Sequence, residues 1–164
     1  MTTNVIIRHE TTEWNELYID TLSPLFPELT FHAAHTLDDA MKLAAQTQVI
    51  IGIGPWMPAS LIAAMPKLEW IQSLTTGLDH FQHMDVLSKQ VPVTRVAGIH
   101  GPQVSELALM LMMALTRRLP AMLDAQKAHQ WDRWVQPALL HKTLCILGLG
   151  SIAETLARYT TTLG

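Results

Sequence analysis

The fold is decided by the stretch Thr143-Leu144-Cys145-Ile146-Leu147-Gly148-Leu149-Gly150-Ser151-Ile152-Ala153. Its first five residues predict a strand, and residues 154–163 predict a helix. The pattern Gly-x-Gly-x-x-Ala therefore lies between a strand and a helix, which is the context that a dinucleotide-binding turn requires. A plain strand–turn–helix connection without a ligand is the alternative that these residues leave open.

Each small residue of this turn has its own physical task. Gly148 permits a tight turn, Gly150 lets a pyrophosphate approach the backbone, and Ala153 lets the helix pack close to the strand. Free amides and the positive end of the helix dipole then face the phosphates. The carboxylate that holds the ribose is expected about 20 residues after the turn, whereas the sequence stops at Gly164. We therefore expect residues 143–164 to open a nucleotide-binding domain whose remainder is absent.

The first 98 residues alternate short apolar runs with helical patterns. Val5-Ile6-Ile7 and Val49-Ile50-Ile51 are the clearest of the strands, and Thr36 with Asp39 predicts a capping box at a helix start. Strands that are apolar throughout suit a parallel sheet covered on both faces, and the alternation predicts a doubly wound α/β fold. The expected strands are 5–7, 29–32, 49–53, 70–74 and 93–96, and the expected helices are 13–21, 37–44 and 58–65.

The pattern changes after Gly98. Residues 101–118 predict one long helix, which is apolar on every side between positions 107 and 115 and is therefore expected to be buried on all sides. Pro120 is expected to break it before a second helix over 121–129. Glycines at 98 and 101 punctuate the chain, so we expect domains over 1–98 and 99–164.

Composition excludes several classes of protein. Of the 164 residues, 49% are hydrophobic and only 15% are charged, which excludes intrinsic disorder and indicates that apolar surface needs a partner. The net charge of −3 and the absence of a basic block argue against nucleic-acid binding. The longest apolar run is far shorter than the roughly 20 residues of a membrane span, and no signal peptide is visible. With Cys145 as its single cysteine, the chain forms no intrachain disulfide, and we expect a cytoplasmic location.

Three stretches resemble the N-terminal portion of the D-isomer-specific 2-hydroxyacid dehydrogenases, truncated within their Rossmann domain. They are 68–80, which contains Thr-Thr-Gly-Leu-Asp, 96–120, and 142–164 around the glycine turn. The resemblance implies a flavodoxin-like parallel-sheet substrate domain followed by the start of a Rossmann NAD(P)-binding domain. It implies hydride transfer from NAD or NADP to a small 2-keto acid of the glyoxylate, hydroxypyruvate or pyruvate type. It also implies a homodimer formed through the helical region 101–130.

The same resemblance assigns substrate-binding residues. Thr76 and Gly77 would offer backbone amides to the substrate carboxylate, and His100 would lie at the crossover between the domains. Local physics agrees, because amides between a strand end and a helix start attract anions. For Trp56, a wall of the substrate cleft competes with simple loop packing.

Cofactor binding is assigned to Gly148, Gly150, Ser151 and Ile152, with Gly101 as a weaker candidate. The family's catalytic histidine, its acidic partner and its arginine lie downstream of the matched region, so no catalytic residue is assigned. His80 and His83, near Asp79 and Asp85, are read as a solvated helix start rather than a metal site, because metal sites need three or four converging ligands.

Two interpretations of function follow. In the first, the chain is part of an oxidoreductase and is inactive by itself. In the second, it is a truncated, catalytically inactive module that binds a small ligand or dimerises. An α/β domain that retains no ligand is a third possibility.

Overall fold

The computed structural model describes residues 2–9, 11–87 and 89–164. The chain divides into two compact units, Met1–Val96 and Ala97–Gly164. The boundary that the sequence predicts, after residue 98, lies two positions later than this division after Val96.

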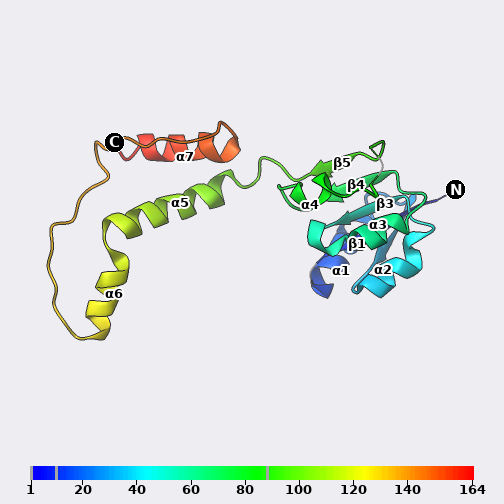
Figure 1. The fold of residues 1–164 in the computed structure, drawn as a ribbon, viewed down its shortest axis with the longest axis horizontal. Coiled ribbons are helices and arrows are strands. Elements are labelled where there is room, and N and C mark those ends of the chain that lie inside the picture. The colour runs from blue at the N-terminus through cyan, green and yellow to red at the C-terminus, as the bar shows by residue number, and fades with distance from the viewer. Residues whose placement is uncertain (1, 10, 88) are drawn as a thin grey trace. The chain divides into compact units, whose positions relative to one another are not determined.

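The first unit contains a five-stranded parallel sheet (Figure 1). Its strands are β1 (Thr3–Arg8), β2 (Leu29–Ala33), β3 (Val49–Gly52), β4 (Trp70–Ser73) and β5 (Val93–Arg95). They lie in the order β2-β1-β3-β4-β5, and every neighbouring pair is parallel. This is the flavodoxin-like order, whose topological switch point lies between β1 and β3. The predicted fold class is confirmed.

Helices cover both faces of this sheet. They are α1 (Thr12–Leu22), α2 (Leu37–Ala44), a 3-10 turn η1 (Gly54–Trp56), α3 (Ala59–Ala63) and α4 (Asp79–Gln82). Right-handed crossovers place α1 on one face and α2, α3 and α4 on the other, because the chain reverses its direction across the sheet after β2. The predicted capping box at α2 is present, with the Asp39 amide donating to Thr36 Oγ1 at 3.1 Å.

The core lies between the sheet and the α2–α3 face. Ile6, Ile50 and Ile71 occupy the same register position on three adjacent strands, and all are fully buried. They pack with residues of α2 and α3 such as Ala40 and Leu61. This contiguous core holds the carboxyl ends of the strands in place, and the loops that carry the candidate site follow from those ends.

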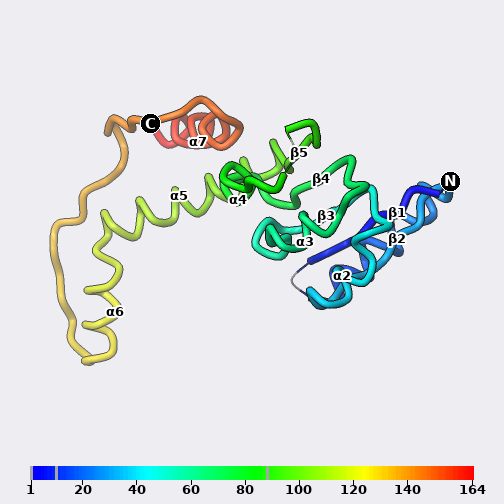
Figure 2. Tube along the Cα trace, turned by 45° about the vertical axis from the view of Figure 1, so that its right-hand side comes forward, coloured from blue at the N-terminus to red at the C-terminus, as the bar shows by residue number. Residues whose placement is uncertain are grey.

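The second unit contains α5 (Gly101–Thr116), α6 (Leu119–Lys127) and α7 (Ser151–Thr161). The helices α5 and α7 pack against each other, as Figure 2 shows. The break after α5 comes at Arg117–Arg118, two residues before Pro120, because Arg118 adopts a left-handed conformation with φ of 53°. Pro120 instead lies in the first turn of α6, where a missing amide costs nothing.

Two predictions for this unit are wrong. Residues 143–147 form no strand, and the second unit has no strand anywhere in its described residues. The physical reason is that a strand needs a hydrogen-bonded partner, and no extended segment lies beside this one. Leu147 and Leu149 are accordingly fully exposed.

The second correction concerns the burial of α5. Only Gly101 and Ser105 are buried, whereas Met110 is 55% and Leu115 is 77% exposed. Residues 107–115 of the helix are apolar on every side, but within the chain α7 covers only part of them. None of the described helices is long and apolar enough to cross a membrane.

Candidate functional site

The glycine turn has the backbone geometry that its sequence predicts. Gly148 has a φ of 104°, a conformation that residues with a Cβ rarely adopt. Gly150 has a φ of −87° and forms the N-cap of α7. A Cβ placed on Gly150 would meet no atom within 4 Å, so the space in front of this residue is open to a ligand.

Unpaired amides line the start of α7. The Glu154 amide donates to the Gly150 carbonyl at 3.0 Å and begins the helical ladder. The amides of Ser151, Ile152 and Ala153 precede that bond and have no partner within the helix. With the positive end of the helix dipole behind them, they form a site that suits a phosphate.

Small residues on α5 bring the beginnings of α5 and α7 together. A Cβ on Gly101 would lie 2.6 Å from Thr155 Oγ1 and 3.2 Å from the Ser151 carbonyl oxygen. One turn later, the buried Ser105 donates its hydroxyl to the Ile152 carbonyl at 3.2 Å. The structure therefore joins the predicted residues Gly101, Ser151 and Ile152 in one place.

Sequence reasoning missed Ser105 and Thr155. The signal that points to Ser105 is its spacing from Gly101, because residues i and i+4 share one helix face and two small residues there allow a close approach. His100 forms the N-cap of α5, is partly buried, and makes no capping hydrogen bond with its side chain.

A hollow of about 410 Å³ lies beside the glycine turn. Gly148 and Ala153 contribute to its wall, whereas Gly150, Ser151 and Ile152 do not. The remaining lining residues are Leu144, Ile146, Leu149, Glu154 and Ala157.

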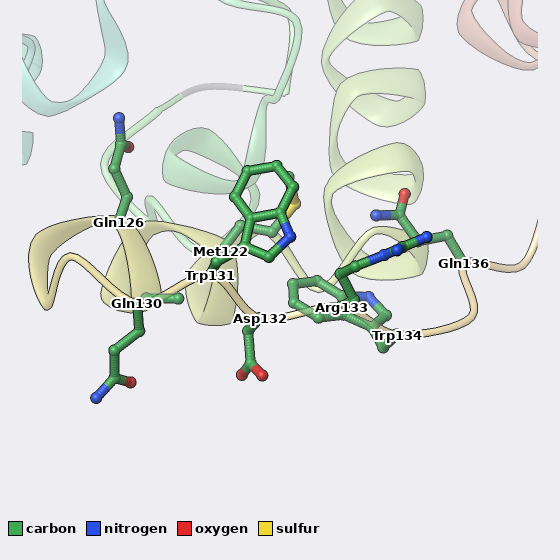
Figure 3. Close-up of a pocket in the computed structure, with 9 residues that line it drawn as sticks. Met122, Gln126, Gln130, Trp131, Asp132, Arg133, Trp134 and Gln136 are labelled. Carbon is green, nitrogen blue, oxygen red and sulfur yellow. The ribbon is translucent and has the colours of Figure 1, made fainter.

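A larger hollow of about 560 Å³ lies between α6 and the segment that follows it (Figure 3). Its wall includes Trp131, which is 91% exposed, and Trp134, whose ring centroid lies 5.2 Å from the Arg118 guanidinium carbon. None of the predicted site residues lines this hollow.

In the first unit, the loop after β4 is held by a chain of hydrogen bonds. The buried Ser73 hydroxyl lies 2.9 Å from Thr75 Oγ1, and that hydroxyl donates to the Gly77 carbonyl at 3.0 Å. Arg95, the last residue of β5, donates from Nη1 to the Thr76 carbonyl at 2.9 Å. Thr76 Oγ1 is buried without a hydrogen-bond partner in the described part of the chain. These hydrogen bonds from Thr75 and Arg95 fix the backbone carbonyls of the loop at Gly77 and Thr76.

Trp56 belongs to the loop after β3 and is 40% exposed. Arg8 is buried at the end of β1, and its Nε donates to the Trp56 carbonyl while its Nη1 donates to the Ala34 carbonyl. Burial lowers the pKa of Arg8, and nearby Asp39 opposes that shift. The loop that carries Trp56 is therefore fixed to the sheet.

No group of three possible metal ligands occurs among the described residues. His80 Nε2 lies 3.1 Å from the Met57 carbonyl oxygen, so this ring is engaged with the protein.

Comparisons with known proteins agree with this geometry. Residues 109–164 match the family described as D-isomer specific 2-hydroxyacid dehydrogenase, NAD binding domain. The chain is 24% identical over 149 residues to a glyoxylate/hydroxypyruvate reductase B of Shigella dysenteriae, and the match covers 85% of this chain and 46% of that protein.

Solved structures give the same result. A D-isomer specific 2-hydroxyacid dehydrogenase family protein of Aeromonas salmonicida matches all of this chain and 52% of its own length, with a TM-score of 0.91 and 26% identity. The D-lactate dehydrogenase of Aquifex aeolicus, solved with NAD and lactic acid, shares the fold with a TM-score of 0.75 and 18% identity, over 97% of this chain and 49% of its own. Residues 109–164 thus resemble the NAD-binding domain of the D-isomer-specific 2-hydroxyacid dehydrogenases, and the chain spans about half the length of the relatives that it matches.

Proposed function

We propose that the chain is a portion of an NAD(P)-dependent 2-hydroxyacid dehydrogenase that reduces a small 2-keto acid to a D-2-hydroxy acid. The observation that carries this proposal is the start of α7, where three unpaired amides follow a glycine turn that is open to a ligand. When bound, the nicotinamide supplies the hydride. NAD and NADP are both compatible with these residues.

Gly148, Gly150, Ser151 and Ile152 are the residues that would hold the pyrophosphate of the cofactor. The first glycine sets the turn, the second leaves the approach open, and the amides of Ser151 and Ile152 donate to phosphate oxygens. Gly101 contributes by allowing α5 to lie close to the Ser151 backbone. Hydrogen bonding of Ile152 to Ser105 keeps this arrangement in register.

Thr76 and Gly77 would bind the carboxylate of the substrate with their backbone amides, and His100 is a further candidate for substrate binding. Gly77 is exposed, and hydrogen bonds to the carbonyls of Thr76 and Gly77 hold its loop, which suits binding of a small anion. The proton donor and the guanidinium that the reaction needs are not assigned to this chain. We therefore expect the 164 residues alone to catalyse no oxidation of NADH with glyoxylate, hydroxypyruvate or pyruvate.

Titration with NADH tests the cofactor site. We expect a saturable change in NADH fluorescence for the wild-type chain and its loss in Gly150→Val, whose side chain fills the approach to the amides. Lys127→Met, at the end of α6, is the control for a surface change in the same unit. A flat titration of the wild-type chain would refute the cofactor site and leave only the fold.

The exposed side of α5 supports a second candidate function, which is self-association through residues 101–130. Leu107, Met110, Leu111 and Leu115 are each about half exposed or more, and such a side chain contributes about 1.5–3 kcal/mol when it is buried. A homodimer would cover this surface. Sedimentation at micromolar concentration tests it, and a monomer there would contradict it.

We place the protein in the cytoplasm, where the exposed thiol of Cys145 stays reduced.

A further inference from the structure

We propose that Arg95 is a positioning residue that orients the backbone amides of Gly77 and Leu78 toward the substrate carboxylate. This inference rests on the proposed function, since it concerns the loop that would bind the substrate. It adds to the site a residue of β5, whereas the loop itself follows β4.

The first step of the argument is the geometry of the peptide unit. The Thr76 carbonyl and the Gly77 amide belong to one planar trans peptide, so they point in opposite directions. Arg95 Nη1 donates to the Thr76 carbonyl at 2.9 Å and thereby fixes that plane. The Gly77 amide must consequently point away from Arg95.

The next peptide is fixed in the same way. Thr75 Oγ1 donates to the Gly77 carbonyl at 3.0 Å, and the buried Ser73 hydroxyl holds Thr75 in turn at 2.9 Å. The Leu78 amide therefore points away from Thr75. In the described part of the chain, neither the Gly77 nor the Leu78 amide has a hydrogen-bond acceptor. Two adjacent donors are thus held ready for an outside acceptor.

Charge supports an anion as that acceptor. A guanidinium that donates to a carbonyl polarises the whole peptide and makes its amide a stronger donor. Asp79 acts in the opposite sense, since its Oδ2 would lie 3.0 Å from a Cβ on Gly77. The charge of Arg95 offsets this carboxylate, so that the loop can accept a second one. Arg95 is exposed, and among the described residues its side chain donates only to the Thr76 carbonyl.

The chemistry of the side chain separates orientation from charge. A guanidinium offers a planar, rigid fork, whereas an ammonium is a flexible point charge. Arg95→Met removes both the charge and the hydrogen bond, and Arg95→Lys retains the charge but loses the rigid planar fork. Lys67→Met is the matched control, because it also removes one positive charge from the first unit. Lys67 precedes β4, whereas the loop follows this strand.

The experiment is an NMR titration of the 164-residue chain with oxalate, a small dicarboxylate probe. We expect the Gly77 and Leu78 amide resonances to move on saturation in the wild type and in Lys67→Met. Arg95→Met should bind oxalate about tenfold more weakly, and Arg95→Lys should fall between them. The ligand-free Gly77 resonance should also shift in both Arg95 variants, while the urea midpoint of the first unit stays unchanged.

The outcomes separate the two proposals. Equal oxalate affinity in the wild type and Arg95→Met, or an unmoved Gly77 resonance in the ligand-free variants, overturns the role of Arg95 and leaves the substrate site standing. Wild-type amide resonances that do not respond to oxalate overturn the carboxylate site, and the inference about Arg95 with it.

Discussion

Replacing Gly101 with alanine tests how the two helix starts are held together. The new Cβ would lie 2.6 Å from Thr155 Oγ1, and ordinary van der Waals contact begins at 3.4 Å, so the atoms must separate by about 0.8 Å. Thr155 cannot rotate freely, because its hydroxyl donates to the Ser151 carbonyl at 2.8 Å. That carbonyl would itself lie 3.2 Å from the new methyl group. The helix α7 must therefore move away from α5.

The energetic cost follows from these distances. Overpacking of this kind costs about 1–3 kcal/mol, and the better helix propensity of alanine returns up to about 1 kcal/mol. We expect a net loss of about 1–2 kcal/mol in the unfolding free energy of the second unit. Lys127→Met, a surface change at the end of α6, is the control in the same unit.

The assay is a urea titration followed through the NMR signals of amides in α5 and α7. Such signals report the second unit alone, whereas tryptophan fluorescence mixes both units. Thr155→Ala should recover most of this loss of stability when it is combined with Gly101→Ala. The wild type, the two single variants and the double variant form a double-mutant cycle. A urea midpoint for Gly101→Ala equal to those of the wild type and Lys127→Met would refute the close approach of the two helices.

Three further predictions use other parts of the structure. Ser105→Ala should lower the unfolding free energy of the second unit by about 1 kcal/mol in the same urea assay, because the Ile152 carbonyl loses a buried donor; no change would contradict that bond. Hydrogen bonds from Thr36 and Lys42 hold the pKa of Asp39 below its ordinary value, so it stabilises the fold at neutral pH and loses this effect as pH falls through the lowered pKa. The thermal midpoint of Asp39→Asn should therefore fall below that of the wild type at pH 7 and converge with it in acid, and parallel pH profiles would contradict this. Asp79→Asn should bind oxalate about threefold more tightly in the NMR titration, because it removes a negative charge beside Gly77, and weaker binding would show that the carboxylate does not oppose the anion.

The strands and most helices were predictable because their signals are local. Runs such as Val49-Ile50-Ile51 are bounded by turn residues, and the capping box at Thr36 needs only residues three positions apart. The order of the strands came from family resemblance, because nothing in a strand's own sequence says which neighbour it pairs with. The φ of Gly148 was likewise predictable, since a tight turn after an apolar run requires glycine.

Features that depend on distant residues were missed. The link from Arg95 to Thr76 requires β4 and β5 to be neighbours, and the link from Ser105 to Ile152 spans 47 positions in the chain. The left-handed Arg118 carries no glycine or asparagine signal, so the sequence indicates Pro120 rather than Arg118 as the end of α5. Residues 143–147 have the composition of a strand, but pairing decides whether a strand forms.

The two candidate sites work by the same physical means, although they lie in different units. In each, backbone amides have no protein acceptor, and side chains behind them hold the peptide planes: Arg95 and Thr75 in one, and Ser105 in the other. The first is supported by a closed core, whereas the second adjoins Leu147 and Leu149, both fully exposed. Rigid donors bind anions better than mobile ones, because less conformational entropy is lost on binding. We therefore expect the loop in the first unit to lose little conformational entropy when it binds oxalate. We expect the second unit to bind NADH more weakly while Leu147 and Leu149 are exposed than when these two side chains are covered.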